Sequence, residues 1–130
     1  MSAFSVELNN QPGELARLCE AMAAQDVNLV LCGTTHGDRG TIAFIAEDET
    51  KARMVLEGMG VEFTDRPALT VRMENVPGTG AATFRALANA NINMDLFLPV
   101  RVSDEQLFAV ICVDDIDAAS RALGDQVITA

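Results

Sequence analysis

The sequence predicts an α+β fold made of two similar units, each with an antiparallel sheet and both of its helices on one face. Two observations support this prediction. The chain repeats itself after about 65 residues, and each copy alternates between the two-residue apolar period of strands and the 3.6-residue period of helices. The expected order is strand, helix, strand, strand, helix, strand. That order is the ferredoxin-like βαββαβ arrangement.

The internal repeat is strongest near the start of each copy. Shifting the sequence on itself by 65 places Asn10-Gln11-Pro12-Gly13 over Asn75-Val76-Pro77-Gly78. The same shift yields nine identities in the 27 positions 5–31, where chance gives about two. A shift of 66 aligns 43–58 with 109–124, which predicts one extra residue in the second hairpin. We expect two domains, 1–65 and 66–130, packed together because a connector over 64–69 is short.

In the first copy, apolar residues alternate near the N-terminus and then recur at helical spacing, so a strand precedes a helix. The helix is expected to bury Leu15, Leu18, Cys19 and Met22. The strand is expected over 4–8 and is joined to that helix by a turn over 10–13. A hairpin follows, with strands over 27–35 and 41–46 around a turn at 37–40. A second helix, capped by Asp48, Glu49 or Thr50, buries Ala52, Val55 and Met59, and a strand over 61–63 ends the copy.

The second copy follows the same order. The elements expected are a strand over 69–73, a helix over 77–89 that buries Ala81, Phe84, Leu87 and Ala88, strands over 92–102 and 107–113 around a turn at 103–105, a helix that buries Ile116, Ala119, Ser120 and Leu123, and a strand over 127–128. Asp114 and Asp115 precede the last helix and are expected to cap it.

Composition excludes several classes of partner. The 19 acidic residues outnumber the 9 basic ones, which gives a formal net charge of −10. Nucleic acids and anionic membranes bind through basic residues, so we expect neither as a partner. No apolar run nears the roughly 20 residues of a membrane helix, and no secretory signal is visible, so we expect a cytoplasmic protein. Its cysteines, Cys19, Cys32 and Cys112, are then expected to be reduced.

Catalysis and cofactor binding are not expected. His36 is the one histidine, and its place near a hairpin tip is typical of a solvated turn residue. Cys32 lies four strand residues away, about 13 Å, which is too far for a nucleophile and base pair. The scattered cysteines with one histidine do not make a metal site. No phosphate loop, GxSxG or CxxC motif is present.

The Asn-x-Pro-Gly turn precedes the first helix of each copy and could present free N–H groups to a carboxylate. Turns of this composition are also ordinary loop geometry. The second turn continues as Thr79-Gly80-Ala81, which is uncharged, whereas Glu14 in the first would repel an anion. We therefore favour the second turn. Asp95 lies in an apolar strand, where it could meet a ligand ammonium or be solvated at the sheet rim; a shift of 65 gives it Val30 as its counterpart.

Residues 74–97, ENVPGTGAATFRALANANINMDLF, closely resemble the ACT domains in the regulatory half of aspartate kinases. Residues 8–31 resemble ACT domains generally. The resemblance implies a regulatory module that binds an amino acid or similar small molecule where two ACT units meet. It implies ligand contacts from the first loop and the start of the second strand, namely Asn75, Val76, Gly78, Thr79, Gly80, Ala81, Asn93, Met94 and Asp95, and in the first copy Asn10, Gln11, Gly13, Glu14, Leu15, Asn28, Leu29 and Val30.

We therefore expect a non-catalytic amino-acid-binding regulator without a cofactor or a metal. The two ACT units are expected to meet within one chain or across a homodimer, and the edge strands favour a homodimer. Either the protein regulates another chain, such as an enzyme, or it acts as a free-standing sensor. The alternative is a structural or assembly ACT module that serves as a partner or regulatory subunit of an enzyme and has no ligand of its own.

Overall fold

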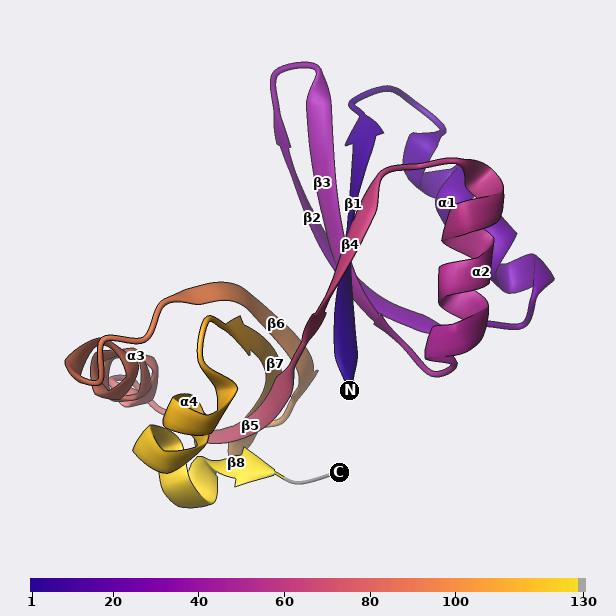
Figure 1. Ribbon diagram of the computed structural model, residues 1–130. Coiled ribbons are helices and arrows are strands. Elements are labelled where there is room, and N and C mark those ends of the chain that lie inside the picture. The colour runs from indigo at the N-terminus through magenta and orange to yellow at the C-terminus, as the bar shows by residue number, and fades with distance from the viewer. Residues whose placement is uncertain (129–130) are drawn as a thin grey trace. The chain divides into compact units, whose positions relative to one another are not determined.

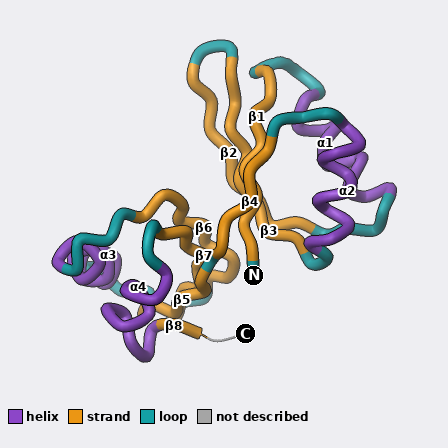
Figure 2. The backbone as a smooth tube through the Cα atoms, viewed as in Figure 1, coloured by secondary structure: helices purple, strands orange, loops and turns teal. Residues whose placement is uncertain are grey.

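Each half of the chain forms a four-stranded antiparallel sheet with two helices on one face (Figure 1, Figure 2). The computed structural model describes residues 1–128. It divides them into two units, Ser2–Arg66 and the chain from Pro67 onward together with Met1. The predicted fold class, two ferredoxin-like βαββαβ units, is confirmed.

The first unit has the strand order β2-β3-β1-β4. Its elements are β1 (Ser2–Asn9), α1 (Glu14–Ala24), β2 (Leu29–His36), β3 (Arg39–Ala46), α2 (Glu49–Met59) and β4 (Phe63–Pro67). The side chains of Phe4, Val6 and Phe44 on the sheet pack against Leu18 of α1 and Leu56 of α2 to form the core. Leu18 and Met22 are buried as expected, whereas Leu15 is 40% exposed.

The second unit has the equivalent strand order β6-β7-β5-β8. Its elements are β5 (Leu69–Glu74), α3 (Thr79–Asn89), β6 (Met94–Val102), β7 (Gln106–Val113), α4 (Ile116–Leu123), the 3₁₀ turn η1 (Gly124–Gln126) and β8 (Val127–Ile128). The side chains of Val71, Ile111, Leu87, Ala119 and Leu123 form its core.

The predicted inner face of α3 is wrong except for Leu87. Thr83 and Leu87 are buried, whereas Ala81, Phe84 and Ala88 are exposed. Thr83 can be buried because the Gln126 side-chain amide donates a hydrogen bond to its hydroxyl at 2.9 Å. That bond gives the Thr83 hydroxyl and the Gln126 N–H a partner each. Phe84 instead packs edge-on against Phe97 of β6, with ring centroids 5.2 Å apart. Apolar periodicity alone could not reveal a buried threonine.

The predicted ends of the first copy also need correction. The strand expected over 61–63 is β4, Phe63–Pro67, and the connector expected over 64–69 does not exist because β5 begins at Leu69. Residues of β4 lack apolar alternation; it is a strand because it pairs with β1 in the sheet. The turn expected over 37–40 is the two-residue loop Gly37-Asp38, flanked by the paired residues His36 and Arg39.

The length difference between the copies is two residues rather than one, and it does not lie in the hairpin turn. Val6 pairs with Ile42 and Val71 pairs with Ala109, so the third strands align at a shift of 67. The pairing of β6 with β7 skips one residue between Met94 and Leu96 and another between Pro99 and Arg101. The two extra residues are therefore the β-bulge residues Asp95 and Val100.

Aspartates begin the second helix of each unit. Asp48 Oδ1 accepts a hydrogen bond from Lys51 N, and Asp115 Oδ1 accepts one from Ala118 N, both at 3.0 Å. Among the three candidates Asp48 is the N-cap, and the expected capping by Asp115 is confirmed. Asp114 has a different partner, since its Oδ1 accepts from Asn93 N at 3.1 Å.

Removing either cap should lower the free energy of unfolding. We expect Asp48→Ala and Asp115→Ala each to cost about 1 kcal/mol, because an N–H of the first helical turn loses its acceptor. Urea denaturation followed by circular dichroism measures this. Asp104→Ala, at the tip of the β6–β7 hairpin, is the matched control and should be neutral; equal losses in all three would contradict the capping role.

An ion pair joins α2 to β4 beside the first core. Arg53 of α2 hydrogen-bonds Asp65 of β4, and its guanidinium lies 5.5 Å from the centre of the Phe4 ring. The hydrogen bond from Arg53 holds the pKa of Asp65 below its ordinary value of 3.8. The lowered pKa means that the pair stabilises the fold above that value and loses its effect as the pH falls through the lowered pKa.

Asp65→Asn should therefore be slightly less stable than the wild type at neutral pH, since both partners are solvent-exposed and the pair is screened. The difference should vanish in acid, once Asp65 is protonated in both states of the wild type. Thermal unfolding at pH 7 and at about pH 2.5 tests this. A difference that grew on acidification would show that the carboxylate is not stabilised by Arg53.

Candidate functional site

The first helix of each unit begins at a left-handed glycine. Gly13 has φ 90° and Gly78 has φ 94°, and neither α1 nor α3 receives a side-chain hydrogen bond at its N-cap. This differs from α2 and α4, whose first turns are capped by aspartates. At α3, Thr79 N bonds Val76 O and Ala82 N bonds Gly78 O. The N–H groups between them, at Gly80 and Ala81, lie at the positive end of the helix and can receive an anion.

Asparagines hold these turns against the adjacent hairpin. Asn75 donates its backbone N–H to Glu105 O at 2.9 Å and its side-chain Nδ2 to Ser103 O at 2.7 Å. Asn10 does the same in the first unit, with Asp38 O at 2.8 Å and Gly37 O at 3.0 Å. The repeated asparagine therefore positions the turn by its hydrogen bonds to the hairpin.

An apolar hollow lies on one flank of the start of α3. It has a volume of about 230 Å³, and its apolar lining is Met73, Val76, Gly80, Phe84, Phe97 and Leu107. Asn75, Thr79 and the charged Glu74 line it as well. Four of the predicted contacts, Asn75, Val76, Thr79 and Gly80, thus meet at one place. A Cβ on Gly80 would lie 3.6 Å from Phe84 and 3.9 Å from Met73, so the glycine leaves room that a small side chain could fill.

The first unit has a counterpart of the apolar hollow at the equivalent place. Its volume is about 470 Å³, and Asn10, Gln11, Glu14 and Leu15 contribute to its lining. Size therefore does not favour the second unit. The charge at the helix start does, because α1 begins with Glu14 whereas α3 begins with the neutral Thr79. Each hollow is also lined by one carboxylate, Glu14 in the first unit and Glu74 in the second.

The predicted contacts at the start of the second strand lie far from this turn. Met94 pairs with Val113, and Glu74 pairs with Gln106. These rows are seven residues apart on β7, or about 23 Å at the usual rise of a strand. Asn93, Met94 and Asp95 therefore lie at the opposite end of their unit from the turn, as do Asn28, Leu29 and Val30 in the first unit. No single unit can use both groups for one small ligand.

Asp95 is exposed and accepts a hydrogen bond from Asn93 Nδ2 at 3.0 Å. The sequence left two alternatives for this carboxylate, contact with a ligand ammonium or solvation at the sheet rim. Its exposure agrees with the second. It is also a bulge residue, so it has no counterpart in β2, and Val30 is the equivalent of Leu96. The sequence shift of 65 paired Asp95 with Val30 because it could not place the bulge.

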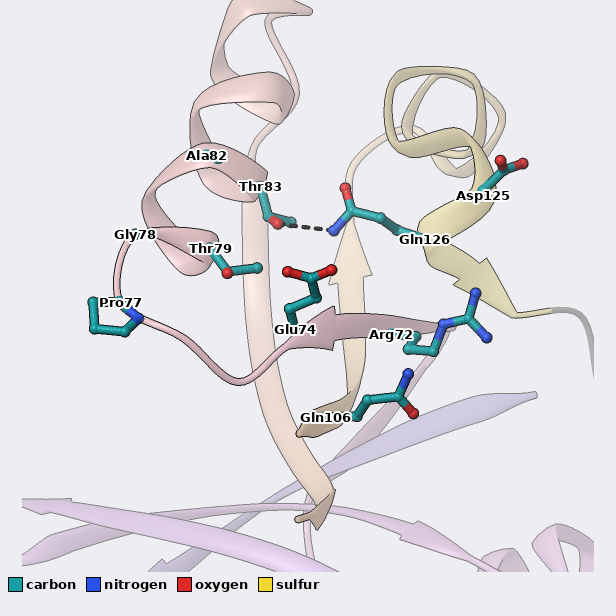
Figure 3. A pocket seen from close by; sticks show the side chains of 10 residues that line it. All are labelled: Arg72, Glu74, Pro77, Gly78, Thr79, Ala82, Thr83, Gln106, Asp125 and Gln126. Carbon is teal, nitrogen blue, oxygen red and sulfur yellow. Dashed lines mark hydrogen bonds between the residues drawn. The ribbon is translucent and has the colours of Figure 1, made fainter. Parts of the chain in front are cut away.

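A larger and more polar hollow lies on the other flank of α3 (Figure 3). Its volume is about 930 Å³, and its lining includes Arg72, Glu74, Thr79, Thr83, Asp125 and Gln126. Sequence analysis found only Gly78 and Thr79 of its residues. Most of the others are polar residues from the strands β5 and β7, the helix α3 and the turn η1, and no sequence motif joins them. We call it the charged hollow.

Other chemistry has little support. Among residues 1–128 no group of three or more His, Cys, Asp or Glu could hold a metal ion. His36 is exposed at the end of β2. Cys112 is buried, Cys19 and Cys32 are half-buried, and all three are free thiols. None of the described helices is both long and apolar enough to span a bilayer.

The chain is similar in sequence to part of an aspartokinase. An aspartokinase from Corynebacterium glutamicum is 28% identical over 136 residues, which cover 92% of this chain and 32% of that protein. The chain thus spans about a third of the length of this curated relative. No family model matches the chain.

Two solved structures share the fold. Protein BT0572 from Bacteroides thetaiotaomicron has a TM-score of 0.85 and 21% identity, covering 98% of this chain and 90% of that one. The ligand-free regulatory subunit of aspartate kinase from Thermus thermophilus has a TM-score of 0.73 and 21% identity, covering 96% and 91%. The whole two-unit chain, and not just one unit, is therefore matched in fold.

The left-handed turn predicts an asymmetry among glycine substitutions. Gly78→Ala should cost about 1–2 kcal/mol of unfolding free energy, because a Cβ disfavours positive φ. Gly58→Ala, at an exposed position inside α2 with open space around it, should stabilise by about 0.5–1 kcal/mol. Chemical denaturation of the two variants measures the contrast. Equal stability of both variants would mean that the Gly78 conformation is not required.

Proposed function

We propose that this chain is a non-catalytic regulatory module of the ACT family that binds an amino acid or similar small molecule. The ligand carboxylate binds the free N–H groups at the start of α3, and the ligand side chain enters the apolar hollow beside it. The observation that carries this proposal is the uncapped, uncharged first turn of α3 placed next to that hollow. Backbone N–H groups at a helix start are a general means of holding a carboxylate.

The contacts at the start of the second strand enter the proposal through a second unit. Because Asn93, Met94 and Asp95 lie at the other end of their own unit, a ligand that touches them together with a turn must be bound where two ACT units meet. We place that seam in a homodimer, in which one unit offers its turn and another the start of its second strand. The equivalent residues of the first unit form a second site of the same kind, weakened by Glu14.

The similarity to an aspartokinase and the shared fold with an aspartate kinase regulatory subunit support a regulatory role. In this proposal the chain regulates an enzyme of that class, present as another chain or another part of the same protein. Ligand binding would change the packing between ACT units, and the enzyme would respond to that change as a coupling free energy. We place the protein in the cytoplasm, where such an enzyme works.

A thermal-shift screen of the twenty amino acids tests the proposal. A true ligand at about 100 times its dissociation constant adds about 2.7 kcal/mol to the free energy of unfolding. Gly80→Asp should abolish the shift, because it puts a negative charge beside the N–H groups that receive the carboxylate. Gly80→Asn is the control of equal size without charge and should keep most of the shift.

The same screen separates the alternative. A chain that serves only as an assembly module should show no shift with any amino acid, while still forming a complex with its enzyme. If a ligand is found and its shift is unchanged in Gly80→Asp but lost in Leu15→Asp, the matching change in the first unit, the first unit rather than the second holds the ligand, and our choice of α3 is wrong.

A further inference from the structure

The charged hollow lies against an uncovered strand edge in the second unit. Among the residues that the structure describes, β8 pairs with Thr70 and Val71 of β5, and β5 continues past that pairing to Glu74. In the first unit the corresponding edge is covered, since Glu7 N bonds Glu62 O at 3.3 Å. The chain of the second unit instead turns through η1, and Gln126 reaches α3 to bond Thr83. That departure opens about 930 Å³ between α3, η1 and the edge of β5.

Two opposite charges on β5 line the charged hollow and do not pair with each other. Within residues 1–128, neither the Glu74 carboxylate nor the Arg72 guanidinium takes part in a salt bridge. Figure 3 shows the Glu74 carboxylate directed toward Thr79 and the Gln126 amide, whereas the Arg72 guanidinium extends away from it along β5. Gln126 donates its amide N–H to Thr83, which leaves its carbonyl oxygen as an acceptor.

The first unit has a smaller hollow at the position that corresponds to the charged hollow. There the hollow is only about 250 Å³, and three of its five charged residues, Glu7, Glu14 and Arg17, have partners within the unit. Arg17 pairs with Glu14 at 3.3 Å, and Glu7 accepts a hydrogen bond from Thr41 at 2.7 Å. At the matching positions the second unit has Ala82, Thr79 and Arg72. The substitutions remove the internal ion pair and leave charged groups facing an open space.

We propose that the charged hollow binds a small zwitterion whose ammonium and carboxylate groups are separated by several carbons. The ammonium binds Glu74, with the Gln126 carbonyl as a second acceptor, and the carboxylate binds Arg72. Residues two apart on a strand have Cα atoms about 6.6 Å apart, and these side chains diverge. An α-amino acid carries both groups on one carbon and cannot reach both partners. The charged hollow lies on the other flank of α3, and Glu74 and Thr79 line both hollows. The proposal does not rest on ligand binding in the apolar hollow.

Two isomers distinguish this geometry from simple charge attraction. 5-Aminovalerate and L-norvaline contain the same atoms, but only the first separates its charges. In a titration of the full chain followed by amide NMR shifts, 5-aminovalerate should move the resonances of Thr79, Thr83 and Gln126 at lower concentration than norvaline. Equal effects of the two isomers, or no shifts at these residues with millimolar 5-aminovalerate, would overturn the proposal.

Charge-neutral variants test the two contacts. Glu74→Gln and Arg72→Gln should each weaken 5-aminovalerate binding about tenfold or more, because each removes a charge-assisted hydrogen bond. Glu14→Gln in the first unit is the matched control and should change nothing. Gly80→Asp, which targets the apolar hollow, should leave 5-aminovalerate shifts in place; their loss in that variant alone would assign the ligand to the other flank. The proposed function can fail in its own screen without affecting this result.

Discussion

The turn between the first strand and the first helix constrains much of what surrounds it in each unit. A residue with φ near +90° must be glycine for steric reasons, and it turns the chain into the helix without a capping side chain. The asparagine three residues earlier fastens this turn to the hairpin tip by two hydrogen bonds. The helix start is thus rigid and uncapped at once. Both hollows of the second unit lie against it, one on each flank.

Two copies of one fold have diverged in the strands that border their sheets. β2 pairs with β3 in regular register from Leu29 to His36, whereas β6 carries two bulges and Pro99. Bulges and proline twist an edge strand and make it a poor template for another strand. At the opposite edge, β4 has five residues, and the described part of β8 has two. In the second unit, β6 is therefore a poor template for a further strand, and the opposite edge at β5 is left partly uncovered by β8. The charged hollow lies at that uncovered edge, which is why it is larger than its counterpart in the first unit.

Charge separates the two units as clearly as shape does. In the first unit, Glu14 at the start of α1 forms a salt bridge with Arg17, and the neighbouring Glu7 accepts a hydrogen bond from Thr41. In the second unit the helix start is neutral, and its nearest charges, Arg72 and Glu74, face a hollow instead of each other. The ion pair of the first unit has no counterpart in the second, where Thr79 and Ala82 occupy the positions of Glu14 and Arg17. Arg72 and Glu74 occupy the positions of Glu7 and Asn9.

The sequence alone determined the repeat, the order of elements and the turns with glycine, because these depend on local periods and on the conformations that single residues allow. The Asn-x-Pro-Gly turn in the sequence also predicted four of the residues that line the apolar hollow. Tertiary structure decided where the bulges at Asp95 and Val100 lie, that Thr83 is buried, and that Asn93 to Asp95 lie about 23 Å from the turn at the usual rise of a strand. It alone brought Arg72, Glu74 and Gln126 together. Strand register and side-chain partners depend on residues distant in sequence, so no local pattern records them.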